Sequence, residues 1–170
     1  MPALLAIDPG LGSTGWAYWN REDKNRCTGP DFFGLVTPRK GDDLLDWWNS
    51  AQQRATDLVD EVNKHWGRIS DLRVVCEMPI FFSGTSGGVA AAETNSLQKL
   101  CFLVGVYARA LSDLGADFEP VTVRDWKGQL PKTVVAQRIL NLIGSYNCEG
   151  FKKDIWDSVG IGLYAKGVFK

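Results

Sequence analysis

The chain lacks any run of about 18 consecutive apolar residues, so the sequence predicts no membrane-spanning helix. It also lacks a basic N-terminal region followed by an apolar stretch, which argues against a secretory signal and predicts a cytoplasmic location. Internal repeats, low-complexity tracts and linkers are absent as well. We therefore expect the 170 residues to form a single domain, residues 1–170, with one sizeable core.

Residues that bind soft metals are few. The four cysteines lie far apart without a CxxC pair, which disfavours a zinc site or a disulfide framework. Cys76 and Cys101 lie in apolar surroundings and are expected to be reduced core residues. The single histidine, His65, ends an amphipathic segment, and we expect an ordinary surface residue there.

Net charge is also small, at −1, and does not by itself indicate a nucleic-acid-binding protein. The charges are unevenly distributed, however. From residue 120 onward there are eight basic residues and only four acidic ones. This imbalance predicts a local basic surface on the C-terminal part of the chain.

The hydrophobic pattern predicts an α/β fold. Apolar runs bounded by Gly and Pro predict strands, and apolar residues at three- and four-residue steps predict helices. The expected strands are residues 3–8, 14–20, 32–37, 72–78 and 118–123, and the expected helices are 44–66, 89–114, 131–143 and 153–166. This order predicts a mixed five-stranded sheet, its first three strands antiparallel, with helices on both faces. It is the element order of the ribonuclease H-like fold.

Four acidic residues stand out by position. Asp8 and Glu77 each end an apolar strand, so parallel neighbouring strands would bring both carboxylates to one edge of the sheet. Asp154 and Asp157 lie three residues apart at the start of the last helix and share a helix face. If that helix packs beside the first strand, all four carboxylates converge.

Such a cluster would need divalent cations to offset its repulsion. Oxygen ligands without His or Cys favour Mg²⁺ or Mn²⁺, and four acids suit a pair of ions that supports in-line displacement at phosphorus. Each acid also has a simpler interpretation. Asp8 could stabilise its own turn, Glu77 could be an exposed charge at a strand end, and Asp154 and Asp157 could be first-turn acids favoured by the helix dipole.

Four segments together resemble RuvC-type Holliday-junction resolvases, in a compact form typical of bacteriophages. They are Ile7-Asp8-Pro9-Gly10 followed by Thr14-Gly15-Trp16, Val75-Cys76-Glu77, Leu130-Pro131-Lys132 with Val135, and Asp154-Ile155-Trp156-Asp157-Ser158 followed by Val159-Gly160-Ile161-Gly162. The resemblance implies a homodimer that makes paired nicks in a four-way DNA junction, in a bacterial or phage-infected cell. The long helix from residue 89 would contribute to the dimer contact or pack in its own core.

The resemblance also implies roles for individual residues. The four acids would be the metal ligands, and Lys132 would stabilise charge on the scissile phosphate. Phe81 and Phe82 follow the second acid and would either stack on DNA bases or pack in a loop. The other expected DNA contacts are Lys127, Lys152 and Lys153, while the neighbouring Trp126 could instead be a core residue.

Other functions share parts of this pattern. An actin-like or sugar-kinase-like ATPase also has a first phosphate loop of the pattern Asp-x-Gly-x-x-x-Thr-Gly, but it needs a second domain for which there is no room. Another ribonuclease H-like nuclease, acting on flaps, RNA–DNA hybrids or packaged genomes, would use the same metal chemistry. A binding module without activity would not need all four acids. The sequence therefore favours a structure-selective endodeoxyribonuclease that cleaves branched DNA.

Overall fold

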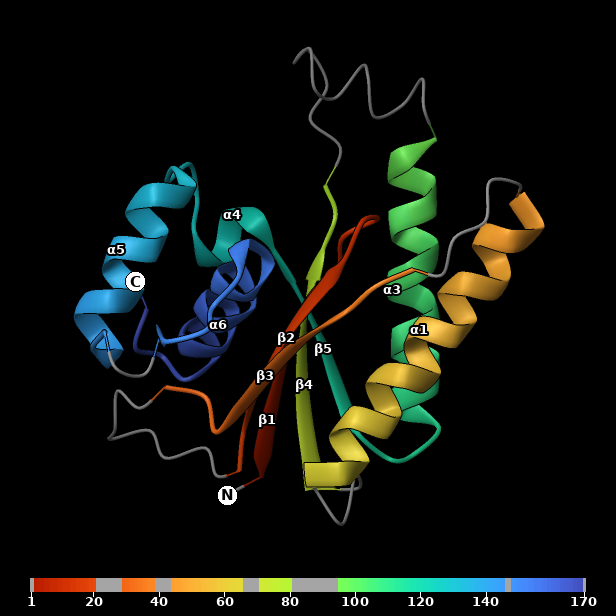
Figure 1. Ribbon diagram of the computed structural model, residues 1–170, viewed down its shortest axis with the longest axis horizontal. Coiled ribbons are helices and arrows are strands. Elements are labelled where there is room, and N and C mark those ends of the chain that lie inside the picture. Colours follow the sequence, from red (N-terminus) through yellow and green to blue (C-terminus); the bar gives the residue numbers. More distant parts are fainter. Residues whose placement is uncertain are drawn as a thin grey trace.

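The computed structural model describes residues 2–20, 29–38, 44–65, 71–80, 95–145 and 148–169 (Figure 1). The strands are β1 (Ala3–Asp8), β2 (Thr14–Trp19), β3 (Phe32–Val36), β4 (Leu72–Met78) and β5 (Asp117–Thr122). The helices are α1 (Leu44–His65), α3 (Ser96–Ser112), α4 (Val123–Trp126), α5 (Lys132–Ile143) and α6 (Lys153–Ala165).

The five strands form one mixed sheet in the order β3-β2-β1-β4-β5. β1 pairs antiparallel with β2, and β2 pairs antiparallel with β3. β1 and β4 are parallel, as are β4 and β5. The predicted fold class is therefore confirmed. Because Ile7 is the register partner of Cys76, the ends of β1 and β4 lie together at one edge, which we call the carboxyl edge.

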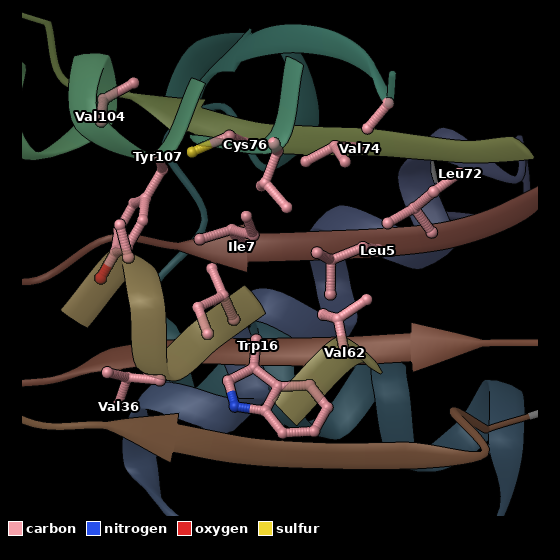
Figure 2. Packing of buried hydrophobic residues seen from close by; sticks show 14 of the residues in the cluster. Leu5, Ile7, Trp16, Val36, Val62, Leu72, Val74, Cys76, Val104 and Tyr107 are labelled. Carbon is pink, nitrogen blue, oxygen red and sulfur yellow. The ribbon is translucent and has the colours of Figure 1, made fainter. Parts of the chain in front are cut away.

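Helices cover both faces of the sheet, with α1 and α3 on one side and α4, α5 and α6 on the other (Figure 1). Side chains alternate between these layers along each strand. Leu5 and Ile7 belong to the cluster under α1 and α3, drawn in Figure 2, whereas Leu4 and Ala6 belong to the cluster under α6. The same alternation directs Asp8 to the α6 face.

Small residues let α6 pack closely against the sheet. A Cβ atom at Gly162 would lie 2.1 Å from the Trp19 ring, and one at Gly160 would lie 2.5 Å from the Trp126 ring. Every residue from 157 to 163 of α6 is buried. The helix is thus a core element that is polar only near its first turn, beside the carboxyl edge.

The main differences from the predicted elements lie around two short segments. The helix expected at residues 89–114 begins at Ser96 within the described residues, and residues 81–94 lie outside them. The helix α4 was not predicted, and it is closed by a capping box between Thr122 and Asp125. Pro131 precedes α5 as its N-cap instead of starting it.

Expectations for single residues can also be checked. Cys76 is a buried free thiol as predicted, but Cys101 is only partly buried. His65 is exposed at the end of α1 and stacks on Phe32, with ring centroids 3.9 Å apart. None of the helices in the described ranges is long and apolar enough to span a bilayer.

Candidate active site

The carboxylates of β1 and β4 face the same layer of helices. On β4, Val75 packs in the cluster under α6, so Glu77 two residues later points to that face as well. Asp8 ends the neighbouring strand on the same face. Burial raises the pKa of Asp8 well above its usual value, and the charges of Glu77 and Asp157 raise it further. Three of the four predicted acids are therefore close enough to interact.

The first turn of α6 approaches the end of β1 because Gly15 has no side chain. Gly15 is the register partner of Asp8 on β2. A Cβ atom at Gly15 would lie 2.0 Å from the backbone carbonyl oxygen of Asp154. No larger residue fits between β2 and α6 at this point without displacing the helix. The close approach thus places the start of α6 beside Asp8.

The Asp154 carboxylate is held by a different contact. The hydroxyl of Ser13, in the β1–β2 turn, donates a hydrogen bond to Asp154 Oδ2. The turn that follows Asp8 is therefore tied directly to the helix that carries the last two acids. Ser13 was not singled out by the sequence analysis, and its position inside the Gly-rich turn was the only signal.

Two lysines neutralise Asp157, whose side chain is only 5% exposed. Lys132 Nζ lies 2.7 Å from Asp157 Oδ2, and Lys127 Nζ lies 3.4 Å from the same atom. Burial acts to lower the pKa of Lys132, but the hydrogen bond and charge of Asp157, with the charges of Asp8 and Asp154, raise it above its usual value. Both lysines also act to lower the pKa of Asp8.

Glu77 is oriented by an indole. Trp126 Nε1 donates a hydrogen bond to Glu77 Oε2 at 2.7 Å. Burial raises the pKa of Glu77, and this hydrogen bond partly offsets the effect. The Trp126 ring is buried against α6 and also carries Lys127 Nζ 4.6 Å above its centroid. Trp126 is therefore a core residue, as one of the two interpretations held, and a contact of the site as well.

The donor set suits a hard divalent cation, because it consists of carboxylate oxygens clustered against their own repulsion. Within the described residues, however, no three or more His, Cys, Asp or Glu side chains lie close enough together to hold an ion as they stand. Asp157 instead pairs with two lysines, and Asp154 with Ser13. Both lysines contact Oδ2 of Asp157, so an ion bound by this carboxylate would lie beside two positive charges.

The other predicted contacts lie around this cluster. Lys152 and Lys153 are exposed at the start of α6, whereas the Lys127 side chain is only 12% exposed and faces into the site. Phe81 and Phe82 lie outside the described residues.

Comparisons with known proteins bear on the fold. The chain matches no protein-family model and no curated protein sequence. Among solved structures, T. thermophilus RuvC in complex with a Holliday junction substrate superimposes with a TM-score of 0.64 at 15% identity, covering 100% of this chain and 99% of that one. The chain has a RuvC-like fold. A second T. thermophilus RuvC structure gives a TM-score of 0.62 at 16% identity, covering 99% of this chain and 98% of that one.

The RuvC-like fold extends to a viral enzyme. The fowlpox virus resolvase, in complex with substrate Holliday junction DNA, gives a TM-score of 0.51 at 13% identity, covering 97% of each chain. At these identities the likeness establishes the architecture. The resemblance to RuvC-type resolvases that four sequence segments predicted is thus confirmed at the level of the RuvC-like fold.

Proposed function

We propose that the protein is a metal-dependent, structure-selective endodeoxyribonuclease that hydrolyses phosphodiesters in Holliday junctions and other branched DNA. The observation that carries this proposal is the gathering of Asp8, Glu77 and Asp157 with Lys132 at the carboxyl edge. The RuvC-like fold supports it, because two enzymes of similar fold were solved with Holliday junction DNA. The enzyme would act in the cytoplasm of a bacterial or phage-infected cell.

The proposed metal ligands are Asp8, Glu77, Asp154 and Asp157, which suit two Mg²⁺ or Mn²⁺ ions. When bound, such ions supply activation of a water molecule and neutralisation of charge on the leaving 3′-oxygen. The chain's own residues prepare this site. Trp126 orients Glu77, and Ser13 orients Asp154.

Lys132 is the proposed contact to the scissile phosphate. Its side chain is 56% exposed although its ammonium group pairs with buried Asp157. It can therefore reach a phosphate at the surface while remaining next to the carboxylates. Lys127 keeps part of the acidic charge balanced from inside the site.

Further DNA contacts are proposed around the site. Lys152 and Lys153 are exposed beside the acidic edge, where they can bind phosphates and fix the orientation of the duplex. Stacking of Phe81 or Phe82 on bases stays a prediction.

A homodimer is proposed to place two such sites on one junction. The support is an apolar groove of about 590 Å³ between α1 and α3, lined by residues including Trp48, Phe102 and Leu114. Trp48 and Leu114 are each 45% exposed, so a second copy of the chain could cover them. This groove lies on the sheet face opposite the carboxylates and would leave them open to DNA.

The test is a nicking assay on labelled DNA. A four-way junction, a three-way fork and an RNA–DNA hybrid are compared in Mg²⁺, in Mn²⁺ and with a chelator. We expect the four-way junction to be cut fastest and the chelator to abolish cutting. Preferential cleavage of the hybrid would instead indicate another nuclease activity on the same fold, and cleavage in chelator would contradict the metal ligands.

The variant Asp8→Asn tests whether the acidic cluster is needed for cleavage. We expect it to abolish nicking while leaving junction binding within about twofold, since phosphate contacts fix the DNA and lie elsewhere. Asp117→Asn is the matched control, because Asp117 is exposed and starts β5 at the opposite end of the sheet. Near-normal cutting by Asp8→Asn would remove Asp8 from the mechanism.

Lys132→Ala should slow cleavage more than it weakens binding.

A further inference from the structure

A buried arginine lies on the sheet face opposite the carboxylates. Arg54 of α1 is 2% exposed, although arginine is almost never fully buried without a partner of opposite charge. Among the described residues no carboxylate pairs with Arg54, and its buried Nε has no hydrogen-bond partner. Burial lowers the pKa of Arg54 and the neighbouring Tyr107 hydroxyl acts to raise it, but an arginine side chain remains protonated in a protein.

Within the described part of the chain, Arg54 contacts the turn between β1 and β2, the first residue of β2, and Tyr107 of α3. Nη2 donates to the carbonyl oxygen of Gly10 at 2.6 Å and to the hydroxyl of Thr14, and Nη1 lies 3.4 Å from the carbonyl oxygen of Leu11. The Thr14 hydroxyl is also 2.8 Å from the hydroxyl of Tyr107 on α3. Figure 2 shows Tyr107 lying beyond Ile7, toward the carboxyl end of β1.

The turn fixed in this way is the one that follows Asp8. A Cβ atom at Gly10 would lie 2.4 Å from the carbonyl oxygen of Ser13, so the turn is tightly folded. On the other face of the sheet Ser13 donates to Asp154. The turn is therefore fixed by Arg54 from one layer and attached to α6 in the other.

The energetic cost of burying the Arg54 guanidinium indicates that the side chain does more than fill space. A buried ion whose partners are neutral is expensive, and an apolar side chain on α1 would pack at lower cost. What an apolar residue cannot do is bind two carbonyl oxygens and a hydroxyl of the turn at once. The five-donor fork of arginine can.

We infer that Arg54 is a positioning residue for cleavage, which fixes the β1–β2 turn and thereby the separation of Asp8 from Asp154. This inference rests on the proposed nuclease function. Residues that hold catalytic groups in place affect rate more than substrate affinity, and small displacements of reacting groups can cost about 100-fold in rate.

The test uses Arg54→Lys in the full chain. Lysine keeps the charge but is a single-point donor that cannot span Gly10, Leu11 and Thr14 together. We expect the single-turnover nicking rate to fall about tenfold or more, with the junction Kd unchanged within about twofold. We also expect faster amide hydrogen exchange across residues 9–15.

Val62→Ala is the matched control, because Val62 is buried on the same helix but does not contact the turn. It should lower the melting temperature without slowing cleavage at a temperature where the protein is folded. If the two variants slow cleavage equally when equally folded, or if Arg54→Lys cleaves like the wild type, the inference is wrong.

Tyr107→Phe, which removes one partner of Thr14, should give a smaller loss of nicking rate than Arg54→Lys.

Failure of the proposed function would be recognised separately. If the wild type cuts no branched DNA, the nuclease proposal fails whatever Arg54 does. Amide hydrogen exchange then decides whether Arg54 holds the turn. Faster exchange at residues 9–15 in Arg54→Lys but not in Val62→Ala would support this role of Arg54. Unchanged exchange would refute it.

Discussion

Three of the four carboxylates of the site have a close polar partner that stabilises them. Asp157 has two lysines, Glu77 has the indole of Trp126, and Asp154 has the hydroxyl of Ser13. Asp8 accepts no hydrogen bond from the residues that the structure describes, and burial and two other acids raise its pKa well above normal. Asp8 is therefore the position where a cation would relieve the most repulsion.

Trp126→Phe tests the orientation of Glu77. Phenylalanine keeps an aromatic ring against α6 and beneath Lys127 but removes the hydrogen bond to the carboxylate. A hydrogen bond to a charged group contributes about 1.5–3 kcal/mol, so we expect the nicking rate to fall about tenfold or more. Rates are measured under single-turnover conditions with the junction bound.

The control for this variant is Trp47→Phe. Trp47 is partly buried on α1, where it packs against Phe102 on the opposite side of the sheet. The same indole-to-phenyl change there should leave the rate unchanged. An equal loss of rate in both variants would mean that Trp126 acts through general packing.

The sequence predicted the acids better than their partners. Asp8 and Glu77 end apolar runs, and Asp154 and Asp157 share a helical spacing, so pattern alone singles them out. Ser13 and Trp126 also contact the site, but their positions in the sequence follow no distinctive spacing. Arg54 did carry a signal that was not used: it lies three residues after Ala51 and four before Leu58, on the buried face of α1.

Among the elements, α6 has little room for displacement toward the sheet, because its first turn lies against β2 at Gly15. Gly15→Ala would place a methyl group 2.0 Å from a backbone oxygen that cannot rotate away. We expect overpacking to cost about 1–3 kcal/mol of unfolding free energy and to lower the nicking rate about tenfold or more by moving Asp154 and Asp157 away from Asp8.

Gly12→Ala provides the comparison within the same turn. A Cβ atom at Gly12 meets nothing within 4 Å, and its φ is not positive. Thermal unfolding and nicking should both stay close to wild type. If Gly15→Ala also stays close to wild type, α6 can shift without consequence and the close approach is unimportant.

Elements whose apolar pattern extends over the whole segment could be predicted almost to the residue. β1 and β4 have the predicted bounds, and α1 begins at the predicted residue. The one-turn helix α4 is too short to show a period, and its capping box depends on the side chain of Asp125. Trp48 lies on the predicted apolar stripe of α1 yet is 45% exposed, since the stripe continues past the sheet into the groove.

At the scale of the whole molecule, the two faces of the sheet have different tasks in the proposed enzyme. One holds the carboxylates, and the other presents the apolar groove between α1 and α3. We expect the wild type to sediment as a dimer at micromolar concentration and Trp48→Glu to sediment as a monomer, since a charge buried in an apolar contact is costly. Analytical ultracentrifugation measures both.

Val134→Glu is the control for the dimer. Val134 is also an exposed apolar residue, 38% accessible, but it lies on α5 away from the groove. It should leave the oligomeric state unchanged. A monomeric wild type, or a Trp48→Glu variant that still dimerises, would contradict the assignment of the groove.

The proposed acidic centre draws its members from distant parts of the chain, with Asp8 near its start, Glu77 near its middle, and Asp154 and Asp157 on the final helix. During translation the first two emerge from the ribosome well before the last two exist. In the proposed enzyme, a nascent chain would therefore lack the complete set of acids until α6 has been made and has docked.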